Sequence, residues 1–163
     1  MTRLLTITLL AVAITIVGPA WSYNSPVAES YATLFARVEG AGADKALHLL
    51  QPDACLNKVK TNEPLVVPDA RTPAKIVVFT SILSDSLPVP IQALFTKANL
   101  DRIPRDKTVV VLCKSGARAT ATGTDLRHTG LENVFILKGG YIALTKHAGS
   151  KEANTPPSAA PVK

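Results

Sequence analysis

Hydrophobic positions in most of this chain form short continuous runs, separated by segments with helical spacing. The runs lie at residues 65–67, at 108–112 (where Thr108 precedes four apolar residues) and at 134–137, and a further short strand candidate, interrupted by His48, lies at 47–50. Continuous apolar runs of this length are typical of strands buried on both faces of a sheet. Because helical segments fall between them, the order of elements predicts an α/β domain with a mainly parallel central sheet flanked by helices.

Three helices can be placed from spacing and from their end signals. One begins near Pro52, and another covers residues 117–128 and stops at Thr129-Gly130. A third covers residues 27–38, where apolar residues recur on one face. These are Val27, Tyr31, Leu34, Phe35 and Val38. The stripe predicts an amphipathic helix, which we interpret as a packing extension rather than a partner site, and residues 40–42 break it.

The two ends of the chain differ from its middle. Residues 1–22 combine Arg3, an apolar run of 14 residues at 4–17, and the small residues of Ala20-Trp21-Ser22. This pattern predicts a secretory signal peptide cleaved after Ser22, with export to a bacterial periplasm and no stable membrane insertion afterwards. The alternative is an uncleaved membrane anchor, for which the run is short, since a span needs about 20 residues.

The expected organisation is a single domain with a helical extension and a tail. From residue 149 onward Ser, Pro, Ala and Lys dominate, which predicts disorder. The predicted parts are a signal peptide at 1–22, an N-terminal helical extension at 23–44, one domain at 45–148 and a disordered tail at 149–163.

The charge of the chain favours small anionic ligands. Lys and Arg number 18 against 12 Asp and Glu, a net charge of +6, and the balance stays basic without residues 1–22. A positive field concentrates anions. The basic residues are scattered, aromatic residues are few, and the two kinds are not interleaved, so nucleic-acid binding is not expected.

One cysteine lies where a strand gives way to a helix. The run at 109–112 ends at Cys113, and a short loop with Lys114, Gly116 and Arg118 leads into the helix. Ligands collect at the carboxyl ends of strands in open α/β sheets, and the N–H groups of such a turn attract negative charge. We therefore predict that Cys113 attacks as a thiolate. The alternative is a buried, inert thiol.

At this point the sequence resembles the rhodanese-like sulfurtransferases. The motif Cys-x-x-Gly-x-Arg, followed by a small residue and Thr, stands at residues 113–120. Residues 64–73 look like the family's strand ending in Asp-x-Arg, here Asp69 and Arg71, and residues 126–141 look like its final helix, strand and double-glycine turn. The resemblance covers roughly residues 45–148 and implies a rhodanese-like fold.

The resemblance also implies a two-step sulfur transfer. Cys113 would take a sulfane sulfur from thiosulfate or a similar anionic donor, and a thiophilic acceptor would remove it: cyanide in an assay, a thiol or thiol protein in the cell. Backbone N–H groups of the loop would hold the transferred sulfur. The residues concerned are Lys114, Ser115, Gly116, Ala117 and Arg118.

Several side-chain roles stay open at this stage. Lys114 either docks the donor's sulfonate or is a solvated surface lysine, and Arg118 either binds substrate or braces the loop. Asp69 and Arg71 are expected at the same sheet edge as Cys113, where they line or brace the site or form a structural ion pair. Pro68 removes an N–H from the strand and predicts a bulge or a weakened ladder.

Loop length separates sulfur transfer from phosphate hydrolysis. Four residues, 114–117, lie between Cys113 and Arg118. Related phosphatases have one residue more in the loop, and usually His before the cysteine, where this chain has Leu112. The shorter loop encloses less space and favours a single sulfur atom over a phosphoryl group.

The chain departs from the family at residues 76–95. These residues lack the family's Gly-His-Ile-x-Gly-Ala segment, and only residues 87–94 keep the expected order of strand, proline and helix.

The remaining Cys and His residues suggest no metal chemistry. Cys55 is interpreted as a small hydrophobe at a core edge, with a resolving thiol as the alternative. His48 and His147 have no ligand spacing with other Cys or His residues, so neither a metal site nor a cofactor is predicted. His128 is interpreted as a partner of a helix C-terminus, with a general base as the alternative. Two rival functions remain: a sulfur carrier that delivers to a partner protein without turnover, and a thiol-redox protein that uses Cys55 and Cys113.

Overall fold

The structure is a computed structural model that describes residues 23–78, 83, 85–149, 151, 154 and 156. The predicted signal peptide and most of the predicted tail lie outside the described residues. At the centre is a five-stranded sheet of order β1-β5-β4-β2-β3, and all of its paired strands are parallel. The strands are β1 (Leu49–Leu50), β2 (Leu65–Asp69), β3 (Ser86–Pro88), β4 (Thr108–Val111) and β5 (Val134–Leu137).

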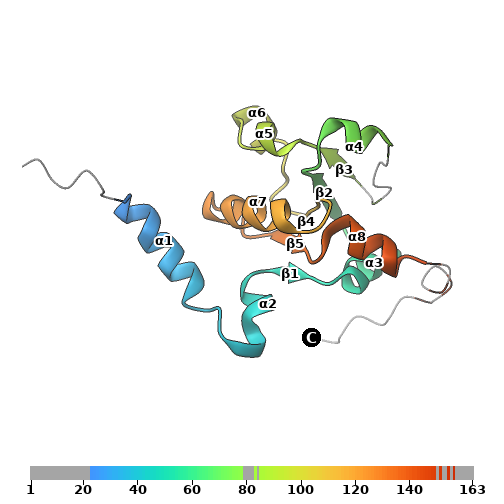
Figure 1. The fold of residues 1–163 in the computed structure, drawn as a ribbon, viewed down its shortest axis with the longest axis horizontal. Helices are drawn as coiled ribbons and strands as arrows, with labels where there is room; N and C mark the ends of the chain where they lie inside the picture. The colour runs from blue at the N-terminus through green and yellow to red at the C-terminus, as the bar shows by residue number, and fades with distance from the viewer. Residues whose placement is uncertain are drawn as a thin grey trace, which may run out of the picture.

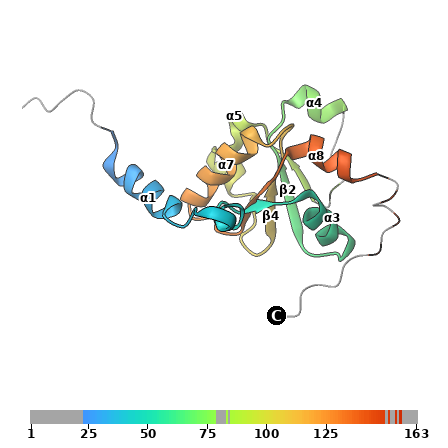
Figure 2. The ribbon, with the colours of Figure 1, turned by 60° about the horizontal axis from the view of Figure 1, so that its bottom comes forward.

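Helices connect the strands and cover both faces of the sheet. They are α1 (Ser25–Phe35), the 3₁₀ turn η1 (Gly40–Gly42), α2 (Ala43–Ala46), α3 (Pro52–Lys60), α4 (Pro73–Val78), α5 (Ile91–Leu94), α6 (Lys97–Leu100), α7 (Ala117–His128) and α8 (Gly140–His147). Figure 2 shows α5 and α7 on one side of the sheet and α3 and α8 on the other. The predicted fold class, a mainly parallel sheet flanked by helices, is confirmed.

Alternation along the strands divides the core into two halves. On β4, Val109 and Val111 pack with Ala119 and Leu126 of α7, whereas Val110 packs in the cluster that contains Cys55 of α3. Successive side chains of a strand point to opposite faces, so a strand covered on both sides must be apolar throughout. This requirement explains why the buried strands appear in the sequence as unbroken runs.

Most predicted elements appear close to their expected positions. The helix at 117–128 and the strand at 134–137 have the predicted limits. The strand expected at 47–50 is shorter, because α2 continues to Ala46 with Leu47 as its C-cap and only Leu49–Leu50 pair with β5. Residues 87–94 form the end of β3 and α5, as the strand-Pro-helix rhythm indicates.

The ladder between β2 and β4 is interrupted at Pro68. Leu65 pairs with Thr108 and Val66 with Val109, and the pairing then resumes only as a single bridge between Asp69 and Leu112. Pro68 has no N–H to donate, although its carbonyl accepts from the Leu112 N–H at 2.8 Å. The predicted weakening of the ladder is therefore present, one residue before Asp69.

The N-terminal extension contacts the domain through the end of α7. Tyr31 of α1 donates a hydrogen bond to Asp125 at 2.6 Å, and its ring lies 3.9 Å from that of His128, centroid to centroid. Figure 1 shows α1 reaching away from the sheet beyond this contact. No residue of α1 is fully buried, and Val27 and Phe35 stay half exposed, so the packing is looser than the apolar stripe indicates.

Among the described residues no helix is both long and apolar enough to cross a membrane.

Candidate active site

Cys113 occupies the turn between β4 and α7, with its sulfur directed at backbone N–H groups. Its Sγ accepts from the Gly116 N–H at 3.2 Å and from the Ala119 N–H at 3.4 Å, and the residue is 1% exposed. The first N–H groups of a helix have no partner within the helix. Gly116, the N-cap of α7, has no side chain to satisfy them, so the sulfur of Cys113 does so. The positive end of the helix dipole therefore faces the sulfur.

Two glycines make this turn possible. Gly116 has φ +97° and Gly140 has φ +60°, in the region that favours glycine. The backbones also approach closely, because a Cβ at Gly140 would overlap the carbonyl oxygen of Cys113 and lie 2.7 Å from the Gly116 nitrogen. The start of α8 is tied to the loop by hydrogen bonds from the Tyr141 N–H to the Cys113 carbonyl and from the Ile142 N–H to the Lys114 carbonyl.

Asp69 and Arg71 form a buried ion pair beside this turn. The shortest contact, from Arg71 Nη2 to Asp69 Oδ2, is 2.6 Å, and the Arg71 guanidinium lies 4.5 Å from the centroid of the Tyr141 ring. The hydrogen bonds to Asp69 raise the pKa of Arg71, against the effect of burial. The pair therefore links the end of β2 to the first turn of α8, a positioning role for both residues.

Arg118 connects the helix to the same region. Its Nη1 donates to the carbonyl of Ala70 at 3.3 Å, and the Ala70 N–H donates to the Leu112 carbonyl at 2.8 Å. This hydrogen bond ties α7 to the turn after β2 and not to the loop's own carbonyls, and both roles that the sequence leaves open for Arg118 stay predictions. The segments around residues 70, 113 and 141 are thus held together by mutual hydrogen bonds.

The other predicted loop residues lie around the rim. Lys114, Ser115 and Ala117 are exposed. Of the five N–H groups expected to surround the sulfur, only that of Gly116 donates to Sγ in the described hydrogen bonds. The second donor, Ala119, was not predicted, because which N–H reaches the sulfur depends on how the turn closes. Tyr141 was not assigned a role either, although its place after the double glycine marked it as part of the turn.

Cys55 lies on the opposite face of the sheet. It is fully buried in the cluster with Leu65 and Val110, whereas Cys113 belongs to the cluster on the α7 side, and both thiols are free. Burial raises the pKa of the Cys55 thiol to about 11. Cys55 is therefore a core residue and not the core-edge residue predicted. It is separated by the sheet from the thiol with which it would have to pair.

The described part of the chain contains no group of three or more His, Cys, Asp or Glu side chains that could hold a metal ion. His48 bonds the carbonyl of Val134 through Nδ1 at 3.1 Å, and His128 bonds Ser30 through Nδ1 at 3.3 Å. Both therefore have structural contacts, at the end of the sheet far from Cys113.

The structure is thus an α/β domain with a parallel sheet, a cysteine at the carboxyl end of a central strand, and a short loop that leads from this cysteine into a helix. A model of the rhodanese-like domain family matches residues 51–147. The chain belongs to this family.

Individual relatives agree with this assignment. A sulfurtransferase from Allochromatium vinosum is 30% identical over 98 residues, which cover 60% of this chain and 88% of that protein. A rhodanese-related protein from Thermoplasma volcanium superposes with a TM-score of 0.52 at 21% identity, over 62% of this chain and 93% of that one.

A protein from Rhodopseudomonas palustris described as a possible tyrosine phosphatase superposes with a TM-score of 0.57 at 20% identity, over 69% of this chain and 93% of that one. At this identity the structural likeness shows the fold alone. The family match and the A. vinosum relative together support sulfur transfer as the general activity.

Proposed function

We propose that this protein moves a sulfane sulfur from thiosulfate, or a similar anionic donor, to a thiophilic acceptor through a persulfide on Cys113. The observation that carries the proposal is the pair of N–H groups, from Gly116 and Ala119, directed at Sγ. Donors in this position stabilise negative charge on sulfur, both in the attacking thiolate and in the thiolate that is regenerated.

The first step forms one bond and breaks one. The Cys113 thiolate attacks the outer sulfur of thiosulfate, a sulfur–sulfur bond forms, and the bond to the sulfonate sulfur breaks, so that sulfite leaves with the electron pair. The exposed Lys114 at the loop rim supplies positive charge where the sulfonate would lie. No external oxidant or reductant is needed.

In the second step the sulfur passes from the Cys113 persulfide to the acceptor. An acceptor thiolate, or cyanide, attacks the terminal sulfur of the persulfide, and the Cys113 thiolate leaves. Splitting the transfer through a covalent intermediate is the usual use of a nucleophilic cysteine. Since the same N–H groups meet the leaving thiolate, they assist both steps.

Intact-mass measurement tests this proposal. The protein incubated with thiosulfate should gain one sulfur atom and lose it on addition of cyanide, and Cys113→Ser should gain none. Cys55→Ser, the matched variant of the thiol on the opposite face, should gain the sulfur as the wild type does. Failure of the wild type to gain sulfur would overturn the proposal.

The same measurement separates the rival functions. Stable loading with negligible cyanide turnover would identify a sulfur carrier. Loss of two hydrogens on mild oxidation, with no loading, would identify a dithiol protein. The structure gives the second rival little support, because Cys55 and Cys113 lie in core clusters on different faces of the sheet.

We also propose that residues 1–22 direct export to the periplasm and are removed after Ser22. The support is the pattern of Arg3, the apolar run at 4–17 and the small residues 20–22. Expression of the full chain in a Gram-negative bacterium should give a periplasmic protein that begins at Tyr23. A chain that keeps Met1 and stays with the inner membrane would indicate an anchor instead.

A further inference from the structure

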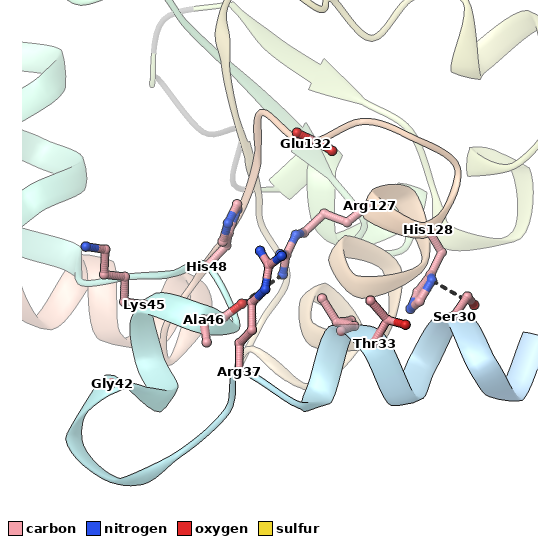
Figure 3. A pocket seen from close by; sticks show the side chains of 11 residues that line it. Ser30, Thr33, Arg37, Gly42, Lys45, Ala46, His48, Arg127, His128 and Glu132 are labelled. Carbon is pink, nitrogen blue, oxygen red and sulfur yellow. Dashed lines mark hydrogen bonds between the residues drawn. The ribbon is translucent and has the colours of Figure 1, made fainter.

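A cavity of about 590 Å³, lined mostly by polar and charged residues, lies at the other end of the sheet from Cys113. Its walls come from the α1–α2 segment, from the last turn of α7 and from the segment just before β5 (Figure 3). The sulfur of Cys113 contacts the first turn of α7, and the 12 residues of this helix span about 18 Å. The cavity is thus separate from the candidate active site.

Two guanidinium groups dominate this cavity. Arg37 follows α1 and Arg127 belongs to the last turn of α7, and Figure 3 shows their side chains reaching toward each other with His48 beside them. Arg127 donates to the carbonyl of Ala46 at 3.3 Å. Neither arginine forms an ion pair with any carboxylate that the structure describes.

The lining contains fewer negative than positive side chains. Glu132 is the one acidic residue of the lining, and it is exposed at the rim. Lys45 also lines the cavity, but its ammonium group points away from the two arginines (Figure 3). The Nε2 of His128 on the same wall is buried and has no hydrogen-bond partner among the described residues.

Burial and the neighbouring charges shift the pKa values of two basic side chains that line the cavity. Burial lowers the pKa of Arg127; the charge of Glu132 raises this pKa, and the charge of Arg37 lowers it to a smaller extent. Burial lowers the pKa of His48, its bond to Val134 opposes this shift, and the charges of Arg127 and Glu132 act on it in opposite directions, Arg127 lowering it and Glu132 raising it. The lining holds Arg37, Lys45 and Arg127 against a single carboxylate, that of Glu132, so its net charge stays positive and would favour a bound anion.

We propose that this cavity binds a small divalent oxyanion of the phosphate or sulfate type, held between Arg37 and Arg127. The planar guanidinium fork matches the oxygens of such anions. Leu34 is the one large aliphatic side chain of the lining, which does not suit a hydrophobic ligand. Because Arg37 belongs to the N-terminal extension and Arg127 to the domain, the bound anion would tie the two together and stabilise the folded protein.

Thermal unfolding of the full chain in phosphate, sulfate and chloride at matched ionic strength tests the proposal. Phosphate, sulfate or both should raise the Tm in a saturable manner, and chloride should not, since it reproduces only the screening. The anion that raises the Tm more is the one that the cavity prefers. Equal effects of all three salts would overturn the proposal.

A charge-removing variant locates the site. Arg37→Gln removes one guanidinium that makes no described hydrogen bond, so the fold should survive, and the affinity for the anion should fall at least tenfold. Arg102→Gln is the matched control, an exposed arginine outside the cavity that should bind as the wild type does. Histidine NMR signals should shift for His48 and not for His147 on anion binding.

The rate at which thiosulfate loads Cys113 shows whether the anion cavity and the candidate active site are independent. Arg37→Gln should load Cys113 from thiosulfate at the wild-type rate, because the cavity lies at the far end of α7. Equal anion affinity in the Arg37 and Arg102 variants, or a shift confined to the Cys113 loop, would show that the anion binds elsewhere.

Discussion

The guanidinium of Arg71 lies over the ring of Tyr141, 4.5 Å from its centroid, while it holds the carboxylate of Asp69. A residue at the end of β2 thereby contacts the first turn of α8, and the Tyr141 N–H holds the carbonyl of Cys113 at 2.8 Å. A cation over an aromatic face is worth about 0.5–2 kcal/mol, depending on burial. The ion pair is thus one link in the support of the cysteine turn.

Removal of the Asp69 carboxylate should destabilise the protein strongly. Both members of the pair are nearly fully buried, so Asp69→Ala leaves a buried guanidinium without its carboxylate, at a cost of about 3–5 kcal/mol. Urea unfolding measures the loss. Asp101→Ala is the control, since its ion pair with Lys97 is exposed and should contribute less than about 1 kcal/mol. Similar losses in the two variants would contradict the structural role of the buried pair.

Addition of a methyl group at Gly140 should displace the cysteine turn. In Gly140→Ala the new Cβ would overlap the Cys113 carbonyl oxygen, so the loop must move. We expect the rate of loading from thiosulfate to fall at least about tenfold, which requires only ~1.4 kcal/mol in the barrier.

Gly130→Ala is the control variant that separates the effect of steric overlap at Gly140 from the effect of backbone strain. Gly130 has φ +89°, but a Cβ at this position would have no described atom within 4 Å, and the residue lies at the far end of α7. Its substitution should cost about 1–3 kcal/mol of stability and leave the loading rate unchanged. An equal loss of rate in both variants would show that strain alone, and not contact with the loop, is responsible.

Cys55 should be dispensable for sulfur transfer. Cys55→Ala removes a thiol from the face of the sheet opposite to Cys113, and we expect wild-type loading with a stability loss of about 1–2 kcal/mol from the cavity created. Because burial raises its pKa to about 11, the native thiol should also resist iodoacetamide at neutral pH. Loss of transfer in Cys55→Ala would instead favour a dithiol mechanism.

The stability of the protein should fall in acid partly through His48. Burial, aided by the charge of Arg127, lowers the pKa of His48 in the folded state. Between this lowered value and the ordinary value of about 6.5, the unfolded chain binds more protons than the folded one. The contribution of His48 is therefore complete above about pH 6.5 and is lost as the pH falls through its folded pKa.

The matched variant for this measurement is His48→Asn. His48 has φ +55°, a conformation that Asn tolerates better than most residues, and Asn does not titrate. Urea unfolding between about pH 7.5 and about pH 5 should show a larger loss of stability for the wild type than for the variant. Identical pH profiles would rule out His48 as a contributor.

Much of the architecture could be predicted because its determinants are local. The buried strands require continuous apolar residues, as in Val109 to Leu112, and α7 begins after a glycine turn and ends before Gly130 with φ +89°. The weakened ladder at Pro68 could also be predicted, because the missing N–H is a property of the proline residue itself.

The details of the site depended on contacts between distant parts of the chain. Neither the donation from Ala119 to Sγ nor the position of Tyr141 under Arg71 follows from spacing, because each depends on how three segments pack at one edge of the sheet. The same holds for Arg37 and Arg127, which are far apart in sequence and meet only when α1 docks against α7.

The sequence by itself determined the strand–turn–helix that carries Cys113, since backbone preference and hydrophobic burial act over a few neighbouring residues. The tertiary structure decided which N–H groups face the sulfur, which side of the sheet holds Cys55, and where Arg37 and Arg127 line one cavity. These depend on the side-by-side order β1-β5-β4-β2-β3, which brings residues distant in the chain into contact through packing.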